Sequence, residues 1–185
     1  MPEELEYPKF QKIKRLNRGC VITEKIDGTN ALVFVGEDGT VRAGQRTKWV
    51  PWPDGPDNHG FAQWVKAHED ELRELGPGHH YGEWYGQGIQ RTYGLTEKRF
   101  ALFRWPKSDF LPECCEMVPA LYKGPFQMEA VKYCIAQLIV GGSKAVPGFM
   151  KPEGVVVWHE AIGFLAKVTC ENDEKPKERR DNATR

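Results

Sequence analysis

The sequence predicts an α+β fold in which antiparallel sheets are flanked by a few helices. Three observations support this class. Short runs rich in β-branched residues outnumber helical stretches, strands and helices follow one another without β–α–β alternation, and no internal repeat is present. At 185 residues the chain is long enough for one well-buried core, so we expect one domain.

Seven runs carry the residue pattern of β-strands and are separated by turn residues. The first three lie close together, and the sequence Glu37-Asp38-Gly39 before the third is typical of a hairpin turn. We therefore expect the chain to open on a small antiparallel meander, and the last two strands to form a hairpin. The seven expected strands are residues 21–26, 31–35, 40–43, 81–85, 99–105, 154–158 and 162–169.

Two stretches keep apolar residues at the period of an α-helix. The first, HGFAQWVKAHEDELRELG, spans residues 59–76, and a Gly-Pro-Gly sequence ends it. The second, FQMEAVKYCIAQLIVGG, spans residues 126–142 and ends at two glycines. Residues 51–58, PWPDGPDN, are too rich in Pro and Gly for regular structure, so we expect a loop there.

Composition limits the partners and the compartment. The 26 basic and 26 acidic residues give a formal net charge of zero, so any affinity for nucleic acid must come from a local patch. The five cysteines have no paired CxxC spacing, and no apolar signal segment opens the chain. We therefore expect a reduced, cytoplasmic protein, in the host cytoplasm if a phage encodes it. No apolar run approaches the ~20 residues that span a bilayer, which argues against membrane insertion.

Three charged residues lie in apolar strand segments. Glu83 lies in the aromatic YGEWYGQGIQ, Glu153 precedes a glycine in KPEGVVVWH, and Lys167 lies inside GFLAKVT. A charged residue with apolar neighbours on both faces of a strand is rarely fully buried unless it is paired or binds something. These residues together predict a polar pocket set in a sheet.

The segment EKIDGTN, residues 24–30, places Lys25 between two carboxylates. Alone, this short pattern is better explained by a solvated lysine before a turn. Beside the polar pocket, Lys25 becomes a candidate nucleophile for a phosphate. An attacking amine must be neutral, and the ordinary pKa of lysine is about 10.4, so desolvation, a cation or a metal must lower it. Arg46 and Lys167 are the candidate cations, and Glu153 is a candidate Mg²⁺ ligand.

The ordered set EKIDGTN, YGEWYGQGIQ, RFALFRW, PEGVVVW and FLAKVT resembles the motifs of the covalent nucleotidyltransferase superfamily of polynucleotide ligases and capping enzymes. It is most similar to nick-sealing RNA ligases of phage type, because GTN together with GxGIQ favours RNA ligases over DNA ligases. The resemblance covers residues 20–170. It implies an ATP-grasp-like adenylyltransferase domain over residues 1–170, without an OB-fold, followed by a charged and disordered tail over residues 171–185.

The resemblance also implies a reaction. Lys25 would attack the α-phosphate of ATP, with Mg²⁺ or Mn²⁺ bound, release pyrophosphate and keep AMP on its side-chain nitrogen. The AMP would pass to a 5′-phosphate end of RNA, and a 3′-hydroxyl would displace it to seal the strand. The other implied roles are adenine contact for Glu24, the later steps for Asn30, a phosphate clamp for Arg46, ribose contact for Glu83, adenine stacking for Phe103, the metal for Glu153 and the α-phosphate for Lys167.

The chain departs from the family pattern near its end. The last motif usually carries two lysines, whereas here only Lys167 is present, with Leu165 or Thr169 at the second position. Only a short charged segment follows, so we expect the substrate to be engaged by the catalytic domain, by the basic tail or by a protein partner that supplies a second domain. The basic tail residues are Lys175, Lys177, Arg179 and Arg180.

Two alternative functions stay open. A small DNA ligase or a capping-type guanylyltransferase is possible because few residues read the base, so DNA is an alternative to RNA as partner. A non-catalytic module that binds nucleotides or nucleic-acid ends is favoured by the last motif, which has one lysine where the family usually has two. Individual residues also have structural alternatives: Phe103 as a core residue, and Trp49 and Trp52 in loop packing rather than base stacking.

Overall fold

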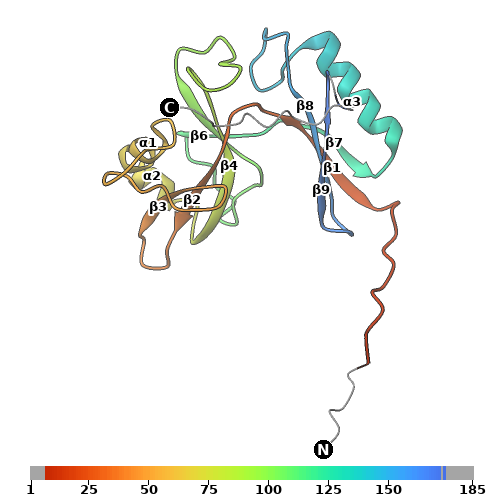
Figure 1. The fold of residues 1–185 in the computed structure, drawn as a ribbon, viewed down its shortest axis with the longest axis horizontal. Helices are drawn as coiled ribbons and strands as arrows, with labels where there is room; N and C mark the ends of the chain where they lie inside the picture. Colours follow the sequence, from red (N-terminus) through yellow and green to blue (C-terminus); the bar gives the residue numbers. More distant parts are fainter. Residues whose placement is uncertain (1–6, 172, 174–185) are drawn as a thin grey trace, which may run out of the picture.

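The computed structural model describes residues 7–171 and residue 173. Figure 1 shows two sheets on either side of the segment that joins β1 to β2, each with its helices on the outer side. The expected α+β class is confirmed, and residues 51–58 form the expected irregular loop.

The five-stranded sheet has the order β3-β2-β4-β5-β6. All its neighbouring strands are antiparallel except β5 and β6, which run parallel, contrary to the all-antiparallel expectation. One face packs against α1 and α2 around Phe61, Trp84 and Phe100. Its elements are β2 (Thr29–Val35), β3 (Val41–Gln45), α1 (Phe61–Ala67), α2 (Glu69–Arg73), β4 (Gly78–Gly86), β5 (Lys98–Leu102) and β6 (Cys115–Met117).

The four-stranded sheet has the order β7-β1-β8-β9 and is antiparallel throughout. The helix α3 covers one face, where Ile22, Leu138 and Val157 form a second core. Because side chains alternate along a strand, the residues between these core positions lie on the opposite face. Its elements are β1 (Gly19–Lys25), β7 (Ala120–Pro125), α3 (Met128–Gly141), β8 (Gly154–His159) and β9 (Phe164–Thr169).

The expected meander at the start of the chain is wrong. The strands β2 and β3 form the predicted hairpin, but β1 pairs with β7 and β8 in the other sheet. The turn residues between β1 and β2 carry the chain from one sheet to the other, a long-range arrangement that local patterns do not encode. The hairpin of the last two strands is confirmed as β8–β9.

Two smaller differences have local causes. The expected helix over residues 59–76 is split at His68, whose φ of −110° and ψ of 21° lie outside the helical region. The His68 ring nitrogen Nδ1 lies 2.9 Å from the carbonyl oxygen of Trp64, where it competes with the backbone ladder. The strands β6 and β7 were not expected; both are edge strands, and their sequences CEM and ALYKGP lack the β-branched pattern.

Two expectations concern the ends of the chain and the membrane. Of the expected tail, only Glu171 and Asp173 are described, and its four basic residues lie outside the described residues. Within the described part of the chain, none of the helices combines the length and the apolar character needed to cross a bilayer.

Candidate active site

Lys25 is the last residue of β1 and is ion-paired with Glu153. Its Nζ donates a hydrogen bond of 2.6 Å to Glu153 Oε2. The contact follows from the strand register, because Lys25 lies opposite Gly154, the first residue of β8, and Glu153 directly precedes it. The lysine side chain is 21% exposed and the glutamate side chain only 5%, so the amine is open to solvent on one side while its partner is buried.

The segment that leaves β1 brings Gly28 against β4. The Gly28 backbone N–H donates a hydrogen bond of 3.0 Å to Glu83 Oε1. A Cβ atom at Gly28 would lie 2.4 Å from the carbonyl oxygen of Trp84, so this close approach requires glycine. Burial raises the pKa of Glu83 to about 7, although the nearby Lys25 opposes the shift. Glu83 therefore lies within the electrostatic reach of the lysine that ends β1.

Asp27, Arg91 and Tyr93 form a hydrogen-bonded group beside Lys25. The Asp27 N–H donates to the Tyr93 hydroxyl at 2.7 Å, and Arg91 Nε donates to Asp27 Oδ2 at 2.9 Å. Arg91 Nη1 also donates to the carbonyl oxygen of Lys151 at 2.8 Å. One guanidinium thus connects the segment after β1 to the segment before β8, and holds both ends of the Lys25–Glu153 pair in place.

The five-stranded sheet carries two more of the expected residues. Asn30 lies opposite Glu83 in the β2–β4 register and shares its face. Phe103 follows β5, is 39% exposed and donates its N–H to the carbonyl oxygen of Tyr81. The neighbouring Arg104 places its guanidinium 4.3 Å from the centre of the Trp158 ring in β8, which links the two sheets.

Lys167 lies on the same sheet face as Lys25. It pairs with Val156, which in turn pairs with Thr23, two residues before Lys25 in β1. Because directly paired residues share a face, Leu165 and Thr169 also point to this side. Thr169 pairs with Gly154 and so lies in the same cross-strand row as Lys25, while Leu165 lies two rows away.

Glu24 lies on the opposite face from Lys25, as strand alternation predicts. Its carboxylate is 1% exposed and accepts three hydrogen bonds from the loop after α3. Ser143 Oγ donates at 2.6 Å, and the backbone N–H groups of Lys144 and Ala145 donate at 2.6 and 2.9 Å. In this conformation the carboxylate anchors that loop, and a contact with adenine stays a prediction.

Arg46 is the expected residue that the structure does not bring to Lys25. It is exposed, follows the end of β3, and its side chain makes no hydrogen bond or ion pair within the described part of the chain. A role as a phosphate clamp would require either the substrate or a movement of the turn after β3.

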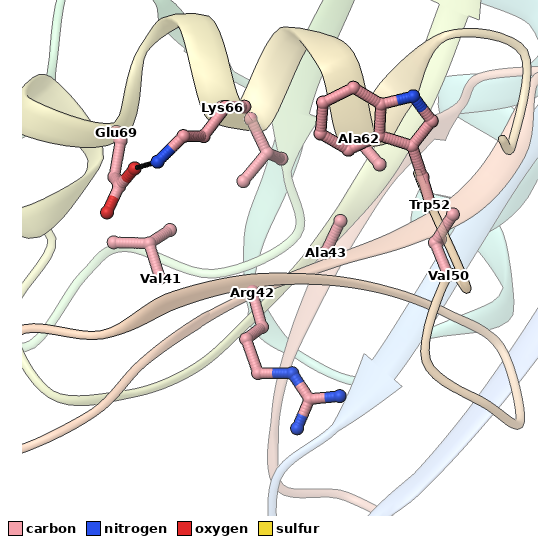
Figure 2. A pocket seen from close by; sticks show the side chains of 9 residues that line it. Val41, Arg42, Ala43, Val50, Trp52, Ala62, Lys66 and Glu69 are labelled. Atoms are coloured by element: carbon pink, nitrogen blue, oxygen red, sulfur yellow. Dashed lines mark hydrogen bonds and ion pairs between the residues drawn. The ribbon is translucent and has the colours of Figure 1, made fainter. Parts of the chain in front are cut away.

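A cavity lies on the other face of the five-stranded sheet. Figure 2 shows it between β3 and α1, with Trp52 at one end and the Lys66–Glu69 ion pair at the other. Its volume is about 200 Å³, and Ala43 and Ala62 line its middle. Because Lys25, Glu83 and Glu153 do not line it, this cavity is separate from the candidate active site.

Comparison with known proteins assigns the family. The sequence model described as RNA ligase matches residues 18–169, which is most of the chain. The chain belongs to the RNA ligase family. No curated protein sequence gave a match.

Solved structures of a Naegleria gruberi RNA ligase are similar in fold to this RNA ligase family member. One mutant, with AMP and Mn, has a TM-score of 0.57 at 20% identity, and another, with ATP and Mn, has 0.58 at 18% identity. The first alignment covers 83% of this chain and 50% of that one, and the second covers 84% and 51%. The chain therefore spans about half the length of these ligases.

Carboxylates near Lys25 fit a divalent cation that arrives with a nucleotide. Among the residues that the structure describes, no group of three or more His, Cys, Asp or Glu side chains is arranged as a complete metal site. In phosphoryl-transfer sites Mg²⁺ is commonly held by one or two carboxylates together with substrate phosphates and water. Glu153, with Glu83 beside Lys25, supplies oxygen ligands of that kind.

Sequence reasoning missed Arg91 and Tyr93. Arg91 directly follows the GxGIQ motif, and its position next to a family motif was the available signal. Tyr93 lies in no recognisable sequence motif. In the structure its backbone is left-handed, with φ of 55°, and its ring packs against Tyr85 and Phe149. Only the folded chain brings its hydroxyl to Asp27.

Proposed function

We propose that this chain is the adenylyltransferase domain of an ATP-dependent RNA ligase, and that Lys25 is its nucleophile. The observation that carries the proposal is the 2.6 Å contact between Lys25 Nζ and Glu153, on the sheet face that also bears Lys167. A solvent-accessible amine, an adjacent buried carboxylate and a cation on one face are the groups needed to transfer a nucleotide through a lysine.

The ligand is proposed to be ATP with Mg²⁺ or Mn²⁺. The similar Naegleria RNA ligase structures contain ATP or AMP together with Mn, which supports this choice of ligands. In the bound state the cation would supply charge neutralisation on the phosphates, and Glu153 is the residue proposed to hold it. Lys167 is proposed to contact the α-phosphate, and Phe103 and Glu83 to contact the adenosine.

The proposed first step forms an N–P bond and breaks a P–O bond. Lys25, an ion-paired ammonium in the free protein, first gives one proton to solvent, since its side chain is 21% exposed. The neutral amine then attacks the α-phosphorus, pyrophosphate leaves as the N–P bond forms, and the nitrogen gives its second proton to water. The resulting lysyl-AMP then passes AMP to an RNA 5′-phosphate, and a 3′-hydroxyl displaces AMP to close the strand.

A strand-sealing assay tests this function. The protein is incubated with ATP, Mg²⁺ and 5′-labelled RNA strands with free 3′-hydroxyl ends, and the products are separated on a denaturing gel. We expect sealed RNA and a transient 5′-adenylylated strand, both absent with Lys25→Ala. Sealing only of DNA, or use of GTP in place of ATP, would each contradict the proposal in a distinct way.

A further inference from the structure

Four aromatic rings form a continuous row on the exposed face of the five-stranded sheet. The ring centre of Trp49 lies 5.7 Å from that of Phe34, edge to face, and Phe34 lies 5.0 Å from His79. His79 and Tyr81 are stacked at 6.3 Å with an interplanar angle of 16°. We call Trp49, Phe34, His79 and Tyr81 the aromatic row. It crosses from the turn after β3, over β2, to β4.

The aromatic row leads to the candidate active site. His79, Tyr81 and Glu83 are alternate residues of β4, so their side chains lie on one face. At about 3.4 Å per residue, the row extends roughly 14 Å along β4 from Glu83 to His79. At the inner end the Tyr81 carbonyl oxygen accepts the Phe103 N–H, so the row continues into the residue proposed to stack on adenine.

Trp49, His79 and Tyr81 are exposed, and Phe34 is half-buried. Trp49 is 38% exposed and Tyr81 48%. The core of this sheet lies on its other face, where Val33 and Ala43 pack toward α1. Figure 2 shows the alternation directly, because Ala43 points toward α1 while Arg42 projects from β3 on the other side. A row of exposed rings on a solvent-facing sheet is available for a ligand.

Basic side chains lie at the Trp49 end of the aromatic row. The Arg42 guanidinium carbon lies 4.5 Å from the centre of the Trp49 ring. Arg46 and Lys48 are exposed in the same turn. Apart from Glu83, the positions of β2, β3 and β4 that pair on this face carry no Asp or Glu, whereas Glu37 and Asp38 lie in the turn between β2 and β3. The surface therefore combines π-faces with cations, which suits bases joined by phosphates.

Stacked rings of this kind suit unpaired bases. In a duplex the bases stack on one another and present only edges and backbone, whereas single-stranded RNA can place its bases on aromatic side chains. We propose that the aromatic row with Arg42 binds the unpaired bases of a single-stranded RNA whose end is delivered to Lys25. This inference rests on the proposed function and makes it more specific, because it favours a single-stranded end over a nicked duplex as substrate.

Binding without ATP tests the inference separately from catalysis. The fluorescence anisotropy of a short labelled oligoribonucleotide is measured with the wild-type protein, single-stranded or annealed to its complement. We expect tighter binding of the single strand, and a loss of roughly 5-fold to 100-fold in that affinity for both Trp49→Ala and Tyr81→Ala. Trp49→Phe and Tyr81→Phe keep a ring and should recover most of the affinity. The control is Tyr133→Ala, an exposed aromatic on α3 that lies outside the row, and it should bind as the wild type does.

Two results would overturn the inference: equal single-strand binding by wild type, Trp49→Ala and Tyr81→Ala, or tighter wild-type binding to the duplex. The same proteins are tested for uptake of AMP from ATP. A wild-type protein that takes up AMP but binds RNA independently of the rings contradicts this inference alone. A protein with ring-dependent binding that takes up no AMP contradicts the ligase proposal alone and supports the aromatic row as a binding surface.

Discussion

Lys25 Nζ lies 2.6 Å from Glu153 Oε2, although 128 positions separate the two residues in the sequence. The contact joins the end of β1 to the start of β8. Arg91 forms hydrogen bonds to both neighbouring segments, at Asp27 and at Lys151. A surface lysine before a turn would have no such partner. This relationship is therefore the feature of the fold that distinguishes a built site from a chance match to a short motif.

Replacing Glu153 tests the function of that pair. Glu153→Gln removes the charge and keeps the side-chain shape, so we expect the fold to survive and the rate of lysine adenylylation to fall roughly 100-fold. The rate is measured by quenching the reaction with ATP and Mg²⁺ and following the adenylylated protein. Glu160→Gln, an exposed carboxylate just past β8, is the matched control. An unchanged rate of adenylylation in Glu153→Gln would show that Glu153 has no role in this reaction.

The raised pKa of Glu83 predicts a pH dependence of stability. Burial raises this pKa from 4.5 to about 7, so the folded protein binds the proton more tightly than the unfolded chain does. The stabilisation from protonated Glu83 is therefore full below pH 4.5 and is lost as the pH rises through about 7. Between these values we expect the free energy of unfolding to fall by roughly 3 kcal/mol from this group.

Glu83→Gln isolates that contribution, because the amide oxygen still accepts from Gly28 but the side chain does not titrate. Urea denaturation of both proteins from acid to neutral pH gives the difference. As the pH rises, the free energy of unfolding of the wild-type protein should fall relative to that of Glu83→Gln. A difference that is constant with pH, or that shifts the other way, would show that Glu83 is ionised in the folded protein across this range.

The buried Glu24 predicts a strong coupling with Ser143. Glu24→Gln weakens charge-assisted hydrogen bonds and should lower the free energy of unfolding by about 2 kcal/mol. A double-mutant cycle with Ser143→Ala should give an interaction energy of about 0.5–3 kcal/mol by urea denaturation. The same cycle with Ser108→Ala, which shares no partner with Glu24, should be additive. Additivity in both cycles would mean that the 143–145 loop is not anchored by Glu24.

Gly28, in the segment that joins β1 to β2, leaves no room for a larger side chain. In Gly28→Ala the new Cβ would lie 2.4 Å from a backbone oxygen, which must move. We expect a loss of about 1–3 kcal/mol in the free energy of unfolding, and slower adenylylation because the backbone that positions Lys25 shifts. Gly141→Ala, where the added Cβ meets only the flexible end of Lys144 at 3.4 Å, is the control and should be close to neutral. Wild-type stability in Gly28→Ala would show that the crossing is looser than the structure indicates.

The sequence predicted the fold class, most strands and the long helix α3 because their signals are local. The β-branched runs and the apolar period of α3 depend on neighbours within a few residues. The assignment of β1 to a different sheet from β2 depends on strands β7 and β8, far along the chain, and no local pattern encodes it. The break at His68 depends on a side-chain hydrogen bond that the apolar period does not register.

The sequence predicted those site residues that lie in short family motifs. Lys25, Glu83 and Glu153 lie in short motifs, and the fold brings them within mutual electrostatic reach. Strand alternation alone accounts for Glu24 and Lys25 lying on opposite faces of β1. The sequence did not indicate that Glu24 anchors the loop at Ser143, nor that Arg91 braces the site, because both contacts join distant segments.

The most direct test of the account is the intact mass of the protein after incubation with ATP and Mg²⁺. Peptide mapping then locates the modified residue. We expect an increase by one AMP on Lys25. The increase should be absent in Lys25→Ala and retained in Lys132→Ala, which changes an exposed lysine on α3. No increase in the wild-type protein, or an AMP on any other residue, would contradict this expectation.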